Sequence, residues 1–317
     1  MKTVYLNKFM SSVVTELEMN GQYGTAHVCG SVLRSVMAFG GEGLPVSGIT
    51  PLWLKAYEGY LLHKGGKGLA WNTVSTYMRM LQAVYNRAVA RKLAAFIPHQ
   101  FRDVFTGRKA DHRRVLERDD MQKLLVERDP DITSPGMAWA RACLELMFRF
   151  HGMPFVDLAH LRKSDLKDGY LTLRRRKTGM PLSARVDGRA MQLLERYRNR
   201  DDTSPYLLCF LDGNLEGMAA YRDYQRILRL LNSRLRALAL WKKVQCKVSS
   251  YSARHTWATV GRYCHIPIEV ISEGLGHASV TTTEGYMKGF GNSRMDRANK
   301  VIMNYIFKGR SNTVYEW

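Results

Sequence analysis

Residues 251–287 hold a dense run of reactive side chains, YSARHTWATVGRYCHIPIEVISEGLGHASVTTTEGYM. Arg254 stands near the start of a predicted helix over 252–264, His277 follows in a Leu-Gly-His turn, and Tyr286 comes nine residues later. Taken alone, an arginine at a helix start is most often a surface charge, a histidine is most often structural, and a tyrosine most often belongs to a core or an interface. Their order and spacing together, in a strongly basic chain, indicate a reactive site.

This set of side chains suits chemistry on a phosphodiester. An arginine can hold two non-bridging oxygens with its fixed fork of donors, and a histidine can donate a further hydrogen bond. A tyrosine hydroxyl can attack phosphorus and form a covalent ester, although its pKa of about 10 requires nearby cations or a base to favour the phenolate. Lys177, in the basic stretch 174–177, can protonate the leaving sugar hydroxyl; the plainer interpretation of this stretch is a generic basic loop.

We predict no metal and no organic cofactor for this chemistry. The sequence has no carboxylate cluster of the two-metal nuclease kind and no glycine-rich phosphate loop. Its five cysteines lie far apart without a CxxC pair, which is typical of free thiols in a reducing compartment and not of a zinc site or a disulfide frame.

Composition limits the class of protein. The chain has 317 residues and a formal charge of +20, from 48 Lys and Arg against 28 Asp and Glu. An apolar content of 45% is enough to build a core, which excludes a disordered basic tail as the main content. This length predicts about two domains. The charge favours nucleic acid over an anionic membrane surface as the partner, with a merely soluble basic protein as the plain alternative.

The expected location is the cytoplasm, with no membrane partner. No stretch approaches the roughly 18 consecutive apolar residues that a membrane helix needs. The first residues, MKTVYLNKFMSSVV, lack the sustained apolar core and the cleavage site of a signal peptide.

The first part of the chain predicts a helical bundle over residues 1–105. Its apolar residues recur every three or four positions in three segments, which are 25–39, 52–63 and 71–92. Asn72 or Thr73 is the expected N-cap of the third helix. Residues 106–114 lack this period and carry four cations. We interpret them as an interdomain linker, which is either a solvated loop or a strap along a phosphate backbone.

The second part, residues 115–317, predicts a mixed domain. A short strand over 169–173 and a turn over 177–181 suggest a hairpin. The helical patterns cover 117–126, 138–150, 187–200, 219–240, 252–264 and 293–307. We expect DNA contacts from cations in both parts: Arg79, Arg87, Arg108, Lys109, Arg113, Arg174, Arg175, Arg176, Arg222 and Arg226.

The ARHT, LGH and TTTEGY elements resemble, in order and spacing, those of the tyrosine recombinases of the phage-integrase type. The resemblance covers both parts of the chain. It implies a mainly α fold with a small β-sheet: a helical core-binding (SAM-like) domain over 1–105, the linker over 106–114 and a mixed α/β catalytic domain over 115–317. It also implies site-specific recombination through a covalent 3′-phosphotyrosine.

The same resemblance assigns roles to individual residues. Tyr286 matches the nucleophile, Arg254 the second conserved arginine, His277 the His/Trp position of the third motif, and Lys177 the hairpin general acid. His255 matches a histidine that often follows the second arginine, where it supports the fold or touches phosphate.

Two positions depart from the family pattern. Tyr251 stands where the family has a histidine, so the base that activates Tyr286 is not assigned. Pro154, which has neither charge nor donor, stands where the family has its first catalytic arginine, and Asp157 falls where the family has an acidic residue. The segment GMPFVD resembles a branch of the family on mobile elements of anaerobic gut bacteria. In that branch another cation replaces the first catalytic arginine. The candidates for that cation are Arg149, His151, Arg162 and one of residues 174–176.

The resemblance further implies the partners. They are double-stranded DNA with short inverted-repeat core sites and, on two such sites, four copies of the chain; without DNA we expect a monomer or a weak oligomer in the cytoplasm, associated with the bacterial nucleoid. Two alternatives stay open. One is a type IB topoisomerase that only relaxes DNA, and the other is a recombinase relative that binds DNA but is impaired in catalysis through Pro154.

Overall fold

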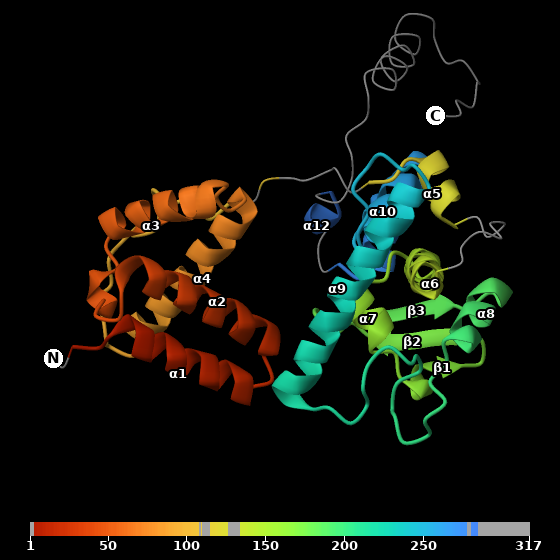
Figure 1. Ribbon diagram of the computed structural model, residues 1–317, viewed down its shortest axis with the longest axis horizontal. Helices are drawn as coiled ribbons and strands as arrows, with labels where there is room; N and C mark the ends of the chain where they lie inside the picture. The colour runs from red at the N-terminus through yellow and green to blue at the C-terminus, as the bar shows by residue number, and fades with distance from the viewer. Residues whose placement is uncertain (1–2, 108, 110–114, 126–133, 278–279, 285–317) are drawn as a thin grey trace, which may run out of the picture. The chain divides into compact units, whose positions relative to one another are not determined.

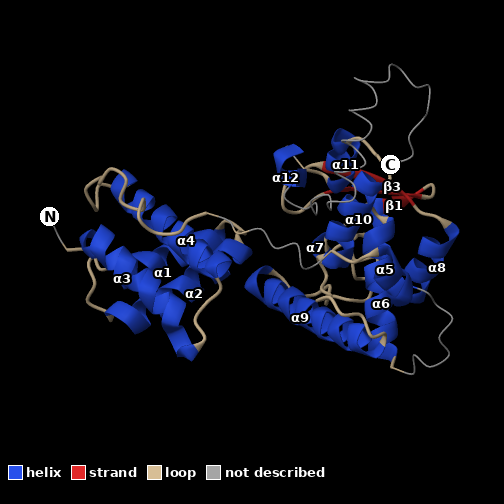
Figure 2. Cartoon of the chain, turned by 90° about the horizontal axis from the view of Figure 1, so that it is seen from above, coloured by secondary structure: helices blue, strands red, loops and turns tan. Residues whose placement is uncertain are grey.

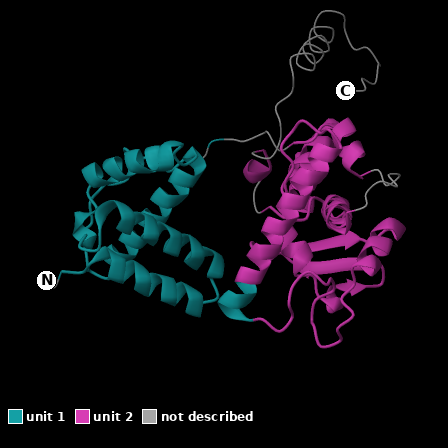
Figure 3. Ribbon diagram, in the orientation of Figure 1, with its two compact units in different colours: residues 1–110, 216–221 teal, residues 111–215, 222–317 magenta. Residues whose placement is uncertain are grey.

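The computed structural model describes residues 3–107, 109, 115–125, 134–277 and 280–284. These fall into two compact units, each with its own apolar core. Unit 1 comprises residues 1–110 and 216–221, and unit 2 comprises residues 111–215 and 222–317 (Figure 3). Each unit is described by itself.

Unit 1 is built from helices (Figures 1 and 2). They are α1 (Leu6–Met19), α2 (Tyr23–Gly40), α3 (Pro51–His63) and α4 (Trp71–Ala90), with short 3-10 turns at Val46–Gly48 and Lys64–Gly66. The three predicted helices are confirmed to within a few residues, and α1 is a helix that the sequence patterns did not predict separately. Val74, Leu81 and Ala88 are fully buried, so the apolar face predicted for α4 does form the core of this unit.

The capping residue predicted for α4 is wrong. The N-cap is Ala70, and no side chain caps the helix start. Asn72 instead bonds the backbone of Lys109 twice, donating to its carbonyl oxygen and accepting from its N–H, each at 2.8 Å. The amide of Asn72 satisfies the backbone of a segment 37 residues away, and it is therefore not used on its own helix.

Three more contacts hold Phe105 and the start of the predicted linker on unit 1. The backbone N–H of Phe105 donates to Glu58 at 2.7 Å, and Ser75 donates to the Gly107 carbonyl at 2.6 Å. The ammonium of Lys109 lies 4.3 Å from the centre of the Trp71 ring, at cation–π distance. Residues 105, 107 and 109 are therefore anchored, and Lys109 has an intramolecular partner for its charge.

Replacing Asn72 with alanine should loosen this anchor. Both hydrogen bonds to Lys109 disappear, and because they are exposed we expect only about 0.5–1.5 kcal/mol of lost unfolding free energy. Limited trypsin digestion should cut residues 105–114 several-fold faster than in the wild type. Asn86→Ala, an exposed position on the same helix, is the matched control. Equal cleavage of the two variants would contradict the anchor.

Unit 2 packs helices around a small antiparallel sheet, which confirms the predicted fold class (Figure 1). The strands are β1 (Leu166–Lys167), β2 (Tyr170–Arg174) and β3 (Pro181–Arg185), in that order across the sheet. Leu171 and Ala184 are paired and buried, while their neighbours Thr172 and Ser183 are exposed, as expected for a sheet with one covered face. The hairpin β2–β3 is the one predicted from sequence.

Unit 2 has helices both before and after the three strands in the sequence. They are α5 (Arg118–Leu125), α6 (Pro135–Arg149), α7 (Phe155–Ala159), α8 (Gly188–Arg196), α9 (Gly217–Trp241, whose first residues group with unit 1), α10 (Ser252–Tyr263), α11 (Ile268–Leu275) and α12 (Val280–Glu284), with a 3-10 turn at Lys163–Asp165. The centre is α6, where residues 140–147 are all buried. The sequence patterns did not predict β1, α7, α11 or α12, and the helix predicted over 293–307 lies outside the described residues. No helix in the described part of the chain is long and apolar enough to cross a bilayer.

Candidate functional site

Arg254 is the centre of the candidate site. It lies in the first turn of α10 and is only 5% exposed, so its charge must be met by protein groups. Its Nη1 donates to the Gly152 carbonyl at 3.0 Å, and its Nη2 donates to the Leu275 carbonyl at 2.6 Å. Nη2 also lies 2.8 Å from Nε2 of His277. Two of the three sequence-predicted residues of the 251–287 stretch therefore meet.

Gly152 is required for this arrangement. It has φ of +65°, and a Cβ at this position would lie 2.9 Å from the Cα of Arg254. The left-handed conformation costs an L-residue roughly 1–2 kcal/mol, and the contact leaves no room for a side chain. The loop between α6 and α7 can touch α10 because it carries glycine here.

His277 is held at both ring nitrogens. It follows α11, whose C-cap Gly276 is left-handed, and its Nδ1 lies 2.8 Å from Oγ1 of Thr283. A guanidinium has only donors, so Nε2 of His277 must accept from Arg254 and the ring proton must sit on Nδ1. Burial, followed by the charges of Arg254, Arg175 and Lys177, lowers the pKa of His277 to about 4. The imidazole is therefore neutral at pH 7.

Arg175 is the buried cation that the hairpin contributes. Its side chain is 3% exposed and forms an ion pair with Asp157 at 3.4 Å. It also donates to the Gly274 carbonyl at 3.2 Å, just before the Gly276–His277 corner. A Cβ at Gly276 would come within 2.2 Å of Nε of Arg175, so glycine at this corner lets the guanidinium lie against it.

Asp157 fixes the start of the hairpin turn. Its Oδ2 pairs with Arg175, and its Oδ1 accepts from the backbone N–H of Arg176 at 3.0 Å. Burial raises the pKa of Asp157, while the Arg176 N–H and the neighbouring arginines oppose that rise. The acidic residue predicted at this position is thus a buried carboxyl that is paired with Arg175.

The other hairpin cations face solvent. Lys177 is exposed at the turn, and its charge contributes to the lowered pKa of His277, so it lies within electrostatic reach of the site. Arg174 donates to the Gly179 carbonyl across the turn. The side chain of Arg176 is exposed.

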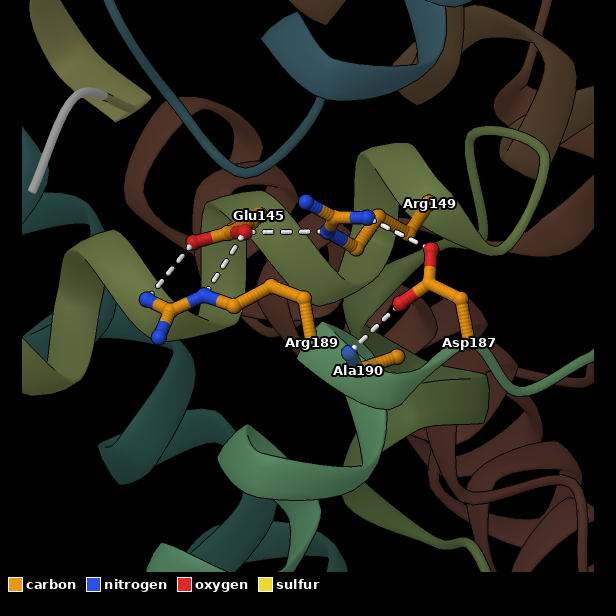
Figure 4. A network of polar contacts seen from close by, with 5 residues as sticks. All are labelled: Glu145, Arg149, Asp187, Arg189 and Ala190. Carbon is orange, nitrogen blue, oxygen red and sulfur yellow. Dashed lines mark hydrogen bonds and ion pairs between the residues drawn. The ribbon is translucent and has the colours of Figure 1, made fainter.

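Arg149 is not brought to this site. It lies in a network between α6 and α8, where it contacts Glu145 at 2.9 Å and Asp187 at 2.6 Å, while Arg189 bonds the same Glu145 (Figure 4). Asp187 also caps α8 through the Ala190 N–H. Arg149 therefore joins two helices, and Arg175 is the candidate substitute that reaches Asp157 and the Gly276 corner.

The remaining candidates differ in exposure. His151 has φ of +55°, and its ring lies 5.6 Å from that of Trp257; burial, and then Arg175, lowers its pKa. Arg162 is exposed. Tyr251 is 43% exposed, with its ring 6.4 Å from that of His255. Tyr286, Arg108 and Arg113 lie outside the described residues.

The helical arginines predicted to contact DNA differ in exposure and in their ion pairs. Arg79 and Arg222 are exposed, and Arg87 pairs with Glu16 at 3.4 Å. Arg226 pairs with Asp223 at 2.8 Å, and its side chain is 65% exposed. In the described part of the chain, no group of three or more His, Cys, Asp or Glu side chains could hold a metal ion.

Sequence reasoning missed two residues of the site, Gly152 and Thr283, and it left Arg175 as one of several alternatives. Thr283 carried a weak signal, since it stands three residues before Tyr286. The signal for Arg175 was the alternation of the strand, because Leu171, Leu173 and Arg175 follow one another at every second position and so share a face.

The neutral state of His277 predicts a pH effect on stability. In the unfolded chain its pKa returns to the ordinary 6.5, so below that pH the unfolded state binds more protons. The contribution of His277 to the free energy of unfolding is therefore fully present above pH 6.5 and is lost as the pH falls towards 4. The melting temperature should fall less over this window in His277→Gln than in the wild type. The control is His27→Gln, at an exposed histidine, whose melting temperature should fall as much as that of the wild type. Parallel curves for wild type and His277→Gln would contradict the assignment.

Known proteins resemble this chain in sequence and in fold. Tyrosine recombinase XerA of Pyrococcus furiosus is 29% identical over 140 residues, which cover 43% of this chain and 46% of that protein. The putative integrase/recombinase y4gC of Sinorhizobium fredii is 26% identical over 180 residues, 55% of this chain and 88% of that protein. The chain thus spans about half the length of the archaeal relative.

Two solved structures share the fold over nearly the whole chain. A lambda integrase dimer bound to a core site has a TM-score of 0.62 at 16% identity, covering 91% of this chain and 97% of that one. The Tn1549 transposon integrase with circular intermediate DNA has a TM-score of 0.63 at 14% identity, covering 95% and 100%.

Family profiles match both parts of the sequence. The phage integrase SAM-like domain matches residues 5–102, and the phage integrase family matches residues 114–290, more than half of the chain. The ARHT and LGH elements that carry Arg254 and His277 lie inside the second match. The chain belongs to the phage integrase family, that of the tyrosine recombinases.

Proposed function

We propose that this chain is a site-specific DNA recombinase, which cleaves and rejoins DNA through a covalent 3′-phosphotyrosine at Tyr286. The observation that carries the proposal is the buried contact between Arg254 and His277, with Arg175 packed against the glycine corner that precedes His277. Two buried guanidinium groups beside a histidine suit one phosphodiester, because charge develops on its non-bridging oxygens during attack.

Each residue has a part in the reaction. Arg254 and Arg175 bind the non-bridging oxygens, and Arg175 thereby supplies the charge that Pro154 cannot. The phenolate of Tyr286 attacks phosphorus, the bond from phosphorus to the 5′ oxygen breaks, and Lys177 gives that oxygen a proton. Asp157 orients Arg175 through their ion pair at 3.4 Å.

His277 must change partner when DNA binds. In this structure its Nε2 accepts from Arg254, so it has no proton there to give to a phosphate oxygen. A bound phosphate displaces this hydrogen bond, and its negative charge raises the pKa of the imidazole. Protonation at Nε2 then lets His277 donate to the phosphate.

The proposal includes an assembly on DNA. Double-stranded DNA with short inverted-repeat core sites is the substrate, and two such sites hold four copies of the chain. A lambda integrase tetramer bound to a Holliday junction is among the structures that share the fold. The GMPFVD segment, which resembles a branch of the family on mobile elements of anaerobic gut bacteria, supports a place on such an element. The proposed place of action is the cytoplasm, on the nucleoid, because the substrate is bacterial DNA.

The proposal is tested with a nicked duplex. A binding site is first selected from random-sequence DNA with the purified chain, and a nick beside the scissile phosphate traps the covalent adduct. We expect an adduct that survives denaturation and strand exchange between two sites. Relaxation of supercoiled DNA without strand exchange would favour the topoisomerase alternative. Tight binding without any adduct would identify an impaired relative.

A further inference from the structure

Thr283 occupies an unusual position in a run of three threonines. Thr281 and Thr282 are exposed, whereas Thr283, the fourth residue of α12, is completely buried. Its Oγ1 lies 2.8 Å from Nδ1 of His277. A buried hydroxyl is satisfied only by a specific partner, so this contact explains why a polar residue is used here.

The direction of the hydrogen bond follows from the other side of the ring. Arg254 can only donate, so Nε2 of His277 accepts from its Nη2 at 2.8 Å. A neutral imidazole carries one proton, which must then sit on Nδ1 and point at Thr283. The threonine oxygen is the acceptor that this tautomer requires.

We propose that Thr283 is a positioning residue, which holds His277 in the Nδ1–H tautomer and keeps its Nε2 directed at Arg254. The inference concerns the hydrogen bonds of His277 to Arg254 and Thr283, and its catalytic consequence rests on the proposed function. Without an acceptor at Thr283, a buried Nδ1–H loses its hydrogen bond, which costs free energy. The ring lowers this cost by turning or by moving its proton to Nε2. Either change breaks the contact with Arg254.

Two substitutions distinguish the acceptor role of Thr283 from a purely structural role. Valine has nearly the same shape as threonine, so Thr283→Val keeps the packing of α12 and removes only the acceptor. Thr283→Ser does the reverse, because it keeps the hydroxyl and removes a methyl group. Thr282→Val, at the exposed neighbouring position, is the matched control.

The tautomer is measured without DNA. The full chain is labelled with ¹⁵N-histidine, and the two ring nitrogens of His277 are identified by the signals missing in His277→Gln. In the wild type we expect a protonated Nδ1 and an unprotonated Nε2 at pH 7. Thr283→Ser and Thr282→Val should keep this pattern, and Thr283→Val should lose it while the other histidine signals stay in place.

Titration adds a second readout. Among the residues that the structure describes, Arg254 on α10 and the hairpin residues Arg175 and Lys177 act on His277 through their charges, and all three remain in every variant. Thr283→Val should therefore shift the titration of His277 alone. A wild-type ring protonated at Nε2, or an unchanged ring in Thr283→Val, would overturn the inference.

Adduct formation shows whether the tautomer serves the reaction. We expect Thr283→Val to slow the adduct by about 2- to 10-fold, because the imidazolium that donates to the phosphate loses the acceptor of its Nδ1–H, one hydrogen bond of ordinary strength. Thr283→Ser should restore the rate. If no variant forms an adduct, wild type included, the proposed function fails while the tautomer result stands; if Thr283→Val loses the tautomer at an unchanged rate, the positioning role in catalysis is excluded.

Discussion

Replacing Tyr286 with phenylalanine should abolish the covalent adduct between this chain and DNA. Phenylalanine keeps the ring and removes only the oxygen that forms the phosphate ester, so no other group can take its place in the bond. DNA binding should stay within about twofold, because most of the affinity comes from phosphate contacts elsewhere. The measurement is the fraction of labelled nicked duplex that stays with the denatured protein.

Tyr251→Phe is the matched control for this experiment. Tyr251 stands at the start of α10, 43% exposed, and its ring lies 6.4 Å from that of His255. Loss of this hydroxyl should leave the adduct in place, at a rate that reports any contact of Tyr251 with phosphate. An adduct of full yield in Tyr286→Phe would show that another residue is the nucleophile.

Removing the charge of Arg175 should slow adduct formation by about 10²- to 10³-fold, the cost of losing one donor to the charge of a transition state. The single change Arg175→Ala is a poor test, because it leaves Asp157 buried and without its ion-pair partner, at a cost of about 3–5 kcal/mol in folding. The double variant Arg175→Gln with Asp157→Asn removes both charges and keeps hydrogen-bonding groups at both positions.

Arg149→Ala separates this role from that of the other candidate cation. Arg149 bridges Glu145 and Asp187, so its loss should lower the melting temperature but leave the adduct rate of the folded enzyme unchanged. A double variant at Arg175 and Asp157 with wild-type rate, or a large rate loss in Arg149→Ala, would contradict the assignment. Thermal melts of each variant show whether a rate loss reflects unfolding.

Local patterns in the sequence predicted most helices and the hairpin, and they failed where the cause was distant. The α4 face was predictable because Val74, Leu81 and Ala88 repeat at helical spacing. The capping role of Asn72 was wrong because its partner, Lys109, lies 37 residues away. Short elements such as α12 contain too few residues for a period to be visible.

The sequence by itself indicated the fold class and the family, and it pointed to Arg254, His277 and Tyr286, because the ARHT, LGH and TTTEGY elements resemble the family's motifs in order and spacing. Only the tertiary structure showed that Arg175 is buried against Asp157 and the Gly276 corner, while Arg174 and Arg176 are exposed. The glycines at 152 and 276 admit two guanidinium groups to one corner, and Asp157 holds one of them there. A contact between residues of distant segments is decided by packing, which no local pattern records.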